Sequence, residues 1–355
     1  MTKTIFYFLD EQLNVLEAVD QYQSAIFTGR YYVEGDFELY LPATPKILAL
    51  SESAAFVARS DKPDVCGIIE NVGISTSAES GDVVTVSGRD ASALLERRIV
   101  WKQTTYSGNA EKVIRNLIES SFIDPEIPAR AVSNFELGAE IGLTQKIRVQ
   151  YTGDTVSSAI QAICKSAETG YRVKLDLQNK KFVFELYQGT DRSYAQNTVP
   201  FVVFSQAFEN LVTSTYQENG ANVKNVLQVA GEGQGNERVK VSVGNASGIG
   251  RKEAFVNAQL KSNNQGELDA LTYQSLLVQD GAQRLAELQP TQQIDGEVAP
   301  SYNFEIGVDY NLGDIVQIEN EYGKSMQPRI TEVIESWSVE GYTCIPRFEE
   351  PTADE

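Results

Sequence analysis

The sequence predicts an α+β fold that is mainly β. Its first hundred residues alternate strand-like runs with turn signals, its middle holds two amphipathic helix patterns, and its last third returns to strands around one long helix. Short strands separated by turns are typical of a small antiparallel barrel or sandwich. A length of 355 residues suits two or three domains. We therefore expect domains at residues 1–100, 101–190 and 191–355.

Runs of β-branched and aromatic residues predict the strands of the first domain. The first of them, 26–33, is followed by an acidic turn and by an alternating run at 37–41, which Pro42 and Pro45 close. Further strands are expected at 56–59, 65–72 and 83–86. A short helix is expected to begin after Asp90 as N-cap, with Leu94 and Leu95 on one side.

Two helices and a hairpin are predicted in the middle domain. Apolar residues at i, i+3, i+4, i+7 and i+8 predict a helix over 110–118 with Asn109 as N-cap. The same pattern runs from Val156 to Ala167, opened by Asp154-Thr155 and ended by Gly170. Two strand patterns then flank a polar turn and predict a β-hairpin at 171–177 and 181–187.

One long helix dominates the predictions for the last domain. Its apolar face is expected to hold five residues, namely Leu268, Leu271, Val278, Ala282 and Leu285. Strand patterns surround it at 225–230, 238–243, 302–306, 314–319, 329–334 and 337–346. The Gly-, Asn- and Ser-rich segments 231–236 and 244–250 are predicted to be loops.

Composition excludes several classes of function. There are 30 Lys+Arg against 49 Asp+Glu, a net charge of −19, which disfavours a nucleic-acid reader or a protein of anionic membrane surfaces. The sequence has no histidine, which removes His-based nucleophile activation and His-ligated metal sites. Cys66, Cys164 and Cys344 form no CxxC motif and are expected to be buried small hydrophobes. No apolar run is long enough for a leader or a membrane span.

No motif marks a catalytic, cofactor or metal site, and none is assigned. The loop at 231–235 has the glycine density of a phosphate loop, but Glu232 and the strand pattern after it predict a hairpin loop. Seven carboxylates are interpreted as turn, cap or solvated-face residues, namely Glu79, Asp82, Asp90, Glu111, Glu168, Asp314 and Glu319. Arg97-Arg98 is interpreted as the exposed side of a short helix, with an acidic partner as the alternative.

Six segments share their order and spacing with a known family. They are Gly88-Arg89-Asp90 with Leu94-Leu95 and Arg98, the helix at 110–118, then 168–172 with its hairpin, 225–233, 250–253 and 312–316. Together they resemble the tail-hub proteins of tailed bacteriophages, specifically the Gram-positive siphophage tail-protein family related to the baseplate hub of contractile tails. The first eighty residues resemble it only in strand character and acidic turns.

The resemblance implies two tube-type antiparallel β-barrel domains with a peripheral α+β domain between them. It further implies a structural role and no enzyme activity: a homotrimeric ring that joins the tail tube to the tip and lets DNA or tape-measure protein pass. The implied partners are a second and third copy, the tail tube or distal tail protein, the tape-measure protein, and tail spike, tip or receptor-binding proteins. DNA would be in non-specific transit, and no membrane or cofactor is implied. The implied location is the tail tip or baseplate of a phage virion or of a phage-tail-like particle such as a bacteriocin, after assembly in the host bacterial cytoplasm.

Two other functions stay open. A tail-associated, carboxylate-based cell-wall hydrolase would need two carboxyl groups roughly 5–9 Å apart in a cleft. A cell-wall carbohydrate-binding module would expose aromatic side chains on one sheet face. Activity on peptidoglycan tests the first, and binding to isolated cell walls tests the second.

Overall fold

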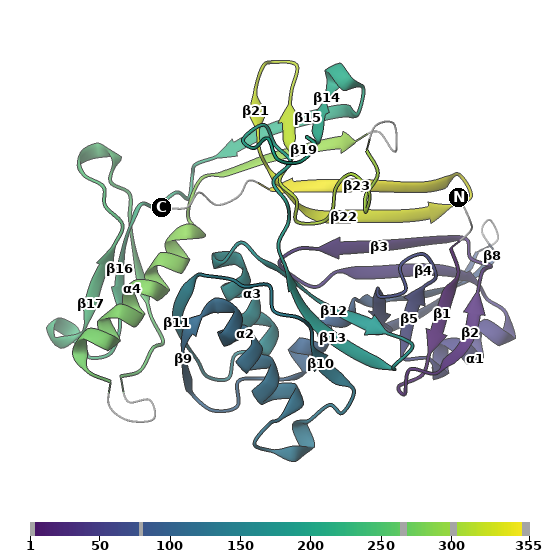
Figure 1. The fold of residues 1–355 in the computed structure, drawn as a ribbon, viewed down its shortest axis with the longest axis horizontal. Coiled ribbons are helices and arrows are strands. Elements are labelled where there is room, and N and C mark those ends of the chain that lie inside the picture. The colour runs from purple at the N-terminus through teal and green to yellow at the C-terminus, as the bar shows by residue number, and fades with distance from the viewer. Residues whose placement is uncertain (1–3, 78–80, 263–267, 299–303, 350–355) are drawn as a thin grey trace.

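The computed structural model describes residues 4–77, 81–262, 268–298 and 304–349. Strands dominate, and helices gather in the middle of the chain and in one module at the end of the long axis (Figure 1). The prediction of an α+β fold that is mainly β is confirmed. None of the sheets that the described residues form closes on itself, so the tube-type barrels and the domain boundaries stay predictions.

Two facing sheets form the first sheet region. Its elements are β1 (Phe6–Leu9), β2 (Val15–Val19), β3 (Ser24–Arg30), β4 (Asp36–Pro42), α1 (Pro45–Ser53), β5 (Phe56–Arg59), β6 (Cys66–Ile68), β7 (Asn71–Ser77), β8 (Gly81–Arg89), β22 (Arg329–Ser338) and β23 (Gly341–Glu349). The four-stranded sheet has the order β2-β1-β5-β6, and the six-stranded sheet has the order β23-β22-β3-β4-β8-β7. Every second residue of β4 is buried in the core between the sheets. This alternation is the one that the sequence shows at 37–41.

The hairpin β22–β23 belongs to two cores at once. It pairs antiparallel with β3, so that Glu332 lies opposite Arg30, far away in the sequence. At one end its Trp337 enters the core of the first sheet region. At the other end Ile330 and Phe348 enter a second core. The C-terminal strands are therefore part of the N-terminal sheet and also tie it to the rest of the molecule (Figure 1).

The peripheral region follows β8 and holds the two predicted helices. Its elements are η1 (Ala91–Arg97), β9 (Thr104–Asn109), α2 (Ala110–Ile118), η2 (Glu119–Ile123), η3 (Pro128–Arg130), β10 (Phe135–Leu137), β11 (Lys146–Tyr151), α3 (Val156–Ser166), β12 (Gly170–Asp176) and β13 (Lys181–Tyr187). Asn109 and Thr155 cap α2 and α3 by accepting hydrogen bonds from backbone N–H groups. The hairpin β12–β13 is antiparallel, as predicted.

The rest of the chain forms a second sheet region and an inserted module. The second sheet region has β14 (Val203–Ser205), η4 (Gln206–Phe208), β15 (Leu211–Asn219), β19 (Thr291–Val298), β20 (Gln317–Glu319) and β21 (Ser325–Met326). The inserted module has β16 (Val226–Ala230), η5 (Gly235–Glu237), β17 (Lys240–Val243), η6 (Gly248–Gly250), β18 (Glu253–Asn257) and α4 (Ala270–Ala286). Because β15 pairs with β19, the module is an insertion in one hairpin.

The predicted buried face of α4 is wrong for most of its residues, although Leu285 is buried as predicted. Leu271 is 79% exposed and Val278 is 44% exposed. The helix instead turns Tyr273 and Leu277 onto the sheet β17-β16-β18. Gly281 fixes this face, because a Cβ atom there would lie 2.6 Å from a methyl group of Val229. The close approach of helix and strand therefore selects a face that apolar spacing alone does not reveal.

Other predictions fail at element boundaries. Helix α1 is absent from the predictions, because Pro45 is interpreted there as the end of a strand. In the structure Pro45 is the first residue of this helix and follows the N-cap Thr44. The helix after Asp90 is a 3₁₀-helix, although its predicted cap is confirmed. Trp337 belongs to β22, not to the next strand, since the turn comes after Ser338. Of the strand predicted at 302–306, residues 302 and 303 lie outside the described residues, and the rest forms no strand.

Candidate functional site

Three of the carboxylates that could have carried acid–base chemistry, Asp90, Glu111 and Asp314, accept hydrogen bonds from backbone N–H groups. Glu111 is 2% exposed and accepts hydrogen bonds from the backbone N–H groups of Ile141, Gly142 and Leu143 at 2.7, 2.8 and 3.0 Å. Its interpretation as a cap or solvated-face residue is wrong, because the helix α2 points it at this loop. A short sequence motif gives no signal for a contact made 30 residues away.

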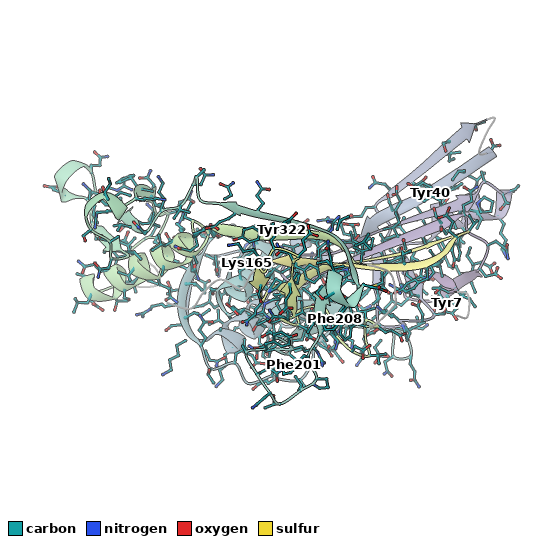
Figure 2. The ribbon with its side chains drawn as sticks, turned by 90° about the horizontal axis from the view of Figure 1, so that it is seen from above. Tyr7, Tyr40, Lys165, Phe201, Phe208 and Tyr322 are labelled. Atoms are coloured by element: carbon teal, nitrogen blue, oxygen red, sulfur yellow. The ribbon has the colours of Figure 1, made fainter. Side chains whose placement is uncertain are left out.

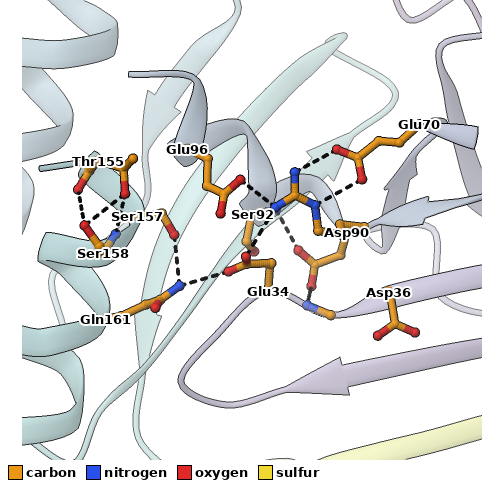
Figure 3. Close-up of polar contacts among 12 residues, drawn as sticks. Glu34, Asp36, Glu70, Asp90, Ser92, Glu96, Thr155, Ser157, Ser158 and Gln161 are labelled. Atoms are coloured by element: carbon orange, nitrogen blue, oxygen red, sulfur yellow. Dashed lines mark hydrogen bonds and ion pairs between the residues drawn. The ribbon is translucent and has the colours of Figure 1, made fainter. Parts of the chain in front are cut away.

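Asp90 joins the first sheet region to the peripheral region. Its carboxylate accepts from the N–H of Gly35 at 2.7 Å and from the N–H of Ser92 at 2.8 Å (Figure 3). Burial raises the pKa of Asp90 to about 6, and these two hydrogen bonds limit the rise. Both oxygens are thus occupied by backbone donors, which is the arrangement of a structural cap.

Arg89 makes a second polar contact at the same boundary. Its guanidinium binds Glu70 through two hydrogen bonds of 2.8 and 3.0 Å and Glu96 at 2.6 Å. Glu34, which is 3.4 Å from Arg89, also accepts from Gln161 of α3 at 2.9 Å (Figure 3). The segment Gly88-Arg89-Asp90, one of those that carry the resemblance, therefore holds α3 and η1 against β8.

Tyr31 lies where the first sheet region, the peripheral region and the second sheet region meet, and we call its surroundings the Tyr31 junction. The side chain is fully buried. Its hydroxyl oxygen is 3.1 Å from the carbonyl oxygen of Glu168 and 3.4 Å from that of Tyr187, and it accepts from the N–H of Gly189 at 3.3 Å. Burial raises the pKa of Tyr31, which keeps the phenol neutral and able to donate.

Glycines make room for the Tyr31 ring. A Cβ atom on Gly170 would lie 2.4 Å from the ring, and one on Gly313 would lie 2.2 Å from it. Gly313 also has a φ of +95°, which a residue with a Cβ atom rarely adopts. Two of the segments that carry the resemblance, 168–172 and 312–316, are therefore brought together around one aromatic ring.

Arg329 closes the Tyr31 junction from β22. Its guanidinium carbon lies 5.3 Å from the centroid of the Tyr31 ring. One terminal nitrogen donates to Glu168 at 2.6 Å and the other to the carbonyl oxygen of Gly313 at 2.8 Å. Glu168 has a φ of +46° just after α3, a conformation uncommon for a non-glycine residue. From this position its carboxylate reaches Arg329.

Asp314 extends the Tyr31 junction into the second sheet region. It is 2% exposed and accepts from the N–H groups of Thr190 and Asn311 at 2.7 and 2.9 Å. It also binds the guanidinium of Arg192 at 2.7 Å. Of the remaining predicted carboxylates, Asp82 is exposed and Glu319 is half-buried, while Glu79 lies outside the described residues.

A buried ion pair fixes the hairpin β22–β23 to the opposite sheet. Arg59 of β5 is 1% exposed and binds both oxygens of Glu335 of β22 at 2.8 and 3.1 Å. Its guanidinium carbon lies 4.5 Å from the ring centroid of Trp337. Burial acts to raise the pKa of Glu335, but Arg59 and Lys62 outweigh it and hold that pKa at about 2. Partners 276 residues apart gave no sequence signal.

A cavity of about 430 Å³ lies beside the Tyr31 junction and reaches Leu312 and Asp90. Charged residues of its lining pair with one another. Arg30, for example, binds Asp36 at 2.6 Å. Likewise, Lys174 lies 3.2 Å from Asp64. Within the described parts of the chain, no three Cys, Asp or Glu side chains gather as metal ligands would.

The other features singled out in the sequence, the 231–235 loop, the cysteines and Arg97, have structural positions in the fold. The loop at 231–235 leads from β16 towards β17, as predicted, and Glu232 accepts from Ser262. Cys66 and Cys164 are buried, as predicted, whereas Cys344 is only half-buried. Arg97 is exposed, as predicted, whereas Arg98 is half-buried. No helix in the described residues is long and apolar enough to span a membrane.

Comparison with protein families decides which family the chain represents. The model of the family described as Siphovirus ReqiPepy6 Gp37-like protein matches residues 5–348. The chain belongs to this family. The family is one of siphovirus tail proteins, so the resemblance to bacteriophage tail proteins is confirmed. A search of curated proteins finds no match for this tail protein.

Solved structures of tail proteins share its fold over nearly the whole chain. The tail protein from Neisseria meningitidis MC58 superposes with a TM-score of 0.60 at 15% identity and covers 98% of this chain and 96% of its own. The 43 kDa tail protein of prophage MuSo2 from Shewanella oneidensis gives 0.58 at 12% identity, covering 98% of both chains. Prophage tail protein gp18 from Listeria monocytogenes EGD-e gives 0.54 at 12% identity, covering 99% and 96%. At sequence identities of 12–15%, these superpositions establish a common fold alone.

Proposed function

We propose that this tail protein is the hub of a bacteriophage tail. Three copies would close a ring in which the first and second sheet regions act as tube-type barrel domains. The strongest support is the extent of the similarity to tail proteins, since both the family match and the structural superposition extend from the first strands to β23. A role as a hub with no enzyme activity also agrees with the carboxylates at 90, 111 and 314, which hold backbone donors.

The two sheet regions are suited to act as one rigid ring element. The hairpin β22–β23 contributes to both cores, and Arg59 and Arg329 attach it to the opposite sheet and to the peripheral region. A ring of cyclic symmetry needs two faces of each subunit to keep a fixed mutual angle. A hairpin shared by both cores limits changes in that angle.

The charge of the chain supports a conduit for DNA. Three copies of a chain with net charge −19 carry −57. An acidic bore would repel phosphates, so DNA could pass without adhering. The proposed partners are the tail tube or distal tail protein above the ring, the tape-measure protein inside it, and tip, spike or receptor-binding proteins below it. The proposed location is the tail tip or baseplate, with assembly in the host cytoplasm.

Native mass tests the ring. Three copies of a 39.2 kDa chain make 117.6 kDa, and electron microscopy of that species should show a central hole. A strict monomer at high concentration, also after mixing with the distal tail protein, would contradict the proposal. Release of fragments from peptidoglycan, or sedimentation with isolated cell walls, would favour the hydrolase or the binding module instead.

A further inference from the structure

A cavity of about 500 Å³ with a mixed polar and apolar lining opens between the first sheet region and the peripheral region. Its lining includes Phe56, Ile68, Leu94, Phe122, Phe135 and Phe182. Arg97, Arg98, Asn134 and Glu11 supply its charged and polar lining. The cavity thus combines aromatic and aliphatic side chains with guanidinium groups.

Three arginines gather beside this cavity, and we call Arg97, Arg98 and Arg130 the arginine cluster. Arg98 donates to the carbonyl oxygens of Arg130 at 3.1 Å and Arg97 at 2.9 Å, and it lies 5.6 Å from the Phe122 ring centroid. Arg130 donates to the carbonyl oxygen of Ile99 at 2.7 Å. Burial and the charges of the other two arginines lower the pKa of Arg98. The three positive charges therefore repel one another in the free chain.

Two carboxylates that could neutralise the arginine cluster are bound elsewhere, and a third, Glu11, lines the same cavity. Glu96 binds Arg89 at 2.6 Å, and Glu126 binds Lys102 at 2.6 Å. Across the described ranges, no carboxylate lies within 4.0 Å of a nitrogen of the cluster, whereas nine other arginines have such a partner. In a chain with a net charge of −19 this is an unusual local excess of positive charge.

We propose that the arginine cluster and its cavity bind an acidic peptide segment of a partner protein, with an aromatic or aliphatic side chain in the cavity. Charge complementarity identifies the occupant: guanidinium groups bind carboxylates through paired hydrogen bonds, and three of them favour several carboxylates over one. The apolar lining stabilises a buried side chain beside those carboxylates. This assignment does not depend on the proposed ring.

Fluorescence anisotropy of the full chain with labelled pentapeptides tests the proposal. The probe is Glu-Glu-Phe-Glu-Glu, and the comparison peptides replace its phenylalanine with glycine or its glutamates with lysine. We expect binding of the probe that weakens as salt rises, weaker binding of the glycine peptide and none of the lysine peptide. Equal binding of all three peptides, or no binding of the probe at millimolar concentration, would overturn the proposal.

Matched variants locate the binding surface. Arg97→Glu reverses an exposed charge of the cluster that holds no backbone carbonyl among the described residues, and we expect it to weaken probe binding roughly tenfold. Lys165→Glu makes the same charge change on an exposed lysine of α3 (labelled in Figure 2) and should leave binding unchanged. Ala54→Phe, which fills part of the cavity, should abolish the preference for the phenylalanine peptide over the glycine peptide. Equal losses in Arg97→Glu and Lys165→Glu, with unchanged melting temperatures, would refute the site.

Discussion

The peripheral region and the inserted module both pack helices on strands, but they are attached to the rest of the chain in different ways. The core of the peripheral region continues into the first sheet region through residues such as Leu9 and Phe56. The core of the inserted module is built from β16, β17, β18, α4 and the segments next to them. Its contacts with β11 include amide hydrogen bonds, such as the one from the N–H of Arg148 to Gln279 at 2.6 Å.

The peripheral region therefore shares its core with a neighbouring region, whereas the inserted module has a core of its own. A core shared across a boundary makes both sides unfold together, whereas a core closed on itself permits local unfolding. The module also lies at one end of the long axis, away from the first sheet region at the other (Figures 1 and 2). We expect the module to form one cooperative unit and the two sheet regions with the peripheral region to form another.

The largest expected effect is on the larger unit. Glu335→Gln removes one of the two carboxylates that bind the buried Arg59. Because Asp61 still binds Arg59 at 2.5 Å, the variant should lose about 3 kcal/mol of unfolding free energy, the lower end of the cost of breaking a buried pair. Urea denaturation would measure the loss. Glu332→Gln is the control, because its pair with Arg30 is half-exposed and should contribute about 1 kcal/mol or less. Similar losses of unfolding free energy in both variants would show that the buried Arg59–Glu335 pair stabilises the fold no more than the half-exposed pair does.

A pair of cavity-forming substitutions tests the separation of the two units directly. Ile160→Ala in α3 and Leu277→Ala in α4 each remove a fully buried side chain and should cost about 3 kcal/mol. Hydrogen exchange should then speed up across the sheet regions and the peripheral region in Ile160→Ala, but only within the module in Leu277→Ala. If Leu277→Ala loosens β3 and β4 as well, the module is not an independent unit.

A smaller effect is expected from crowding the Tyr31 junction. Gly313→Ala places a Cβ atom 2.2 Å from the Tyr31 ring and should cost about 2 kcal/mol more than Gly307→Ala. Both glycines have positive φ, +95° and +84°, so backbone strain is common to both, while a Cβ on Gly307 meets no described atom within 4 Å. Thermal unfolding of the two variants compares them. Equal melting temperatures would show that the junction relaxes around the added methyl group.

The last effect depends on pH and concerns the contact between β8 and η1. Asp90 has a pKa of about 6 in the folded chain against 3.8 when exposed, so the folded state holds an extra proton between these values. Its contribution to stability is therefore complete below pH 3.8 and is lost as pH rises through 6, at no more than about 1.4 kcal/mol per pH unit. The difference in unfolding free energy between wild type and Asp90→Asn, measured from pH 4 to 7, should show this slope. A flat difference would contradict the raised pKa.

The sequence was informative where local patterns decide the structure. The helices α2 and α3 lie where apolar spacing and the caps Asn109 and Thr155 place them, and the hairpin β12–β13 follows from its two alternating strands. The tail-protein resemblance rested partly on the glycine-containing segments 168–172 and 312–316. In the fold, these segments meet at the Tyr31 junction.

Contacts across long sequence distances could not be predicted. Arg59 and Glu335 look like ordinary surface charges in their own strands until β5 and β22 face each other. The face of α4 was missed for a related reason. Leu271 and Val278 form an apolar stripe as regular as the one that is buried, and the choice depends on the fit of Gly281 against Val229. Pairing partners and close approaches are properties of the assembled chain.

The pairing of β22 with β3 also restricts when the molecule can complete its first sheet. Arg30 and its partner Glu332 are 302 residues apart. At a synthesis rate of about 5–20 residues per second, the edge of β3 waits roughly 15–60 s on the ribosome for its neighbour. During that interval its backbone N–H and C=O groups are available to other strands. Completion of the sheet, and any contact between copies that needs it, must therefore wait until β22 has been synthesised.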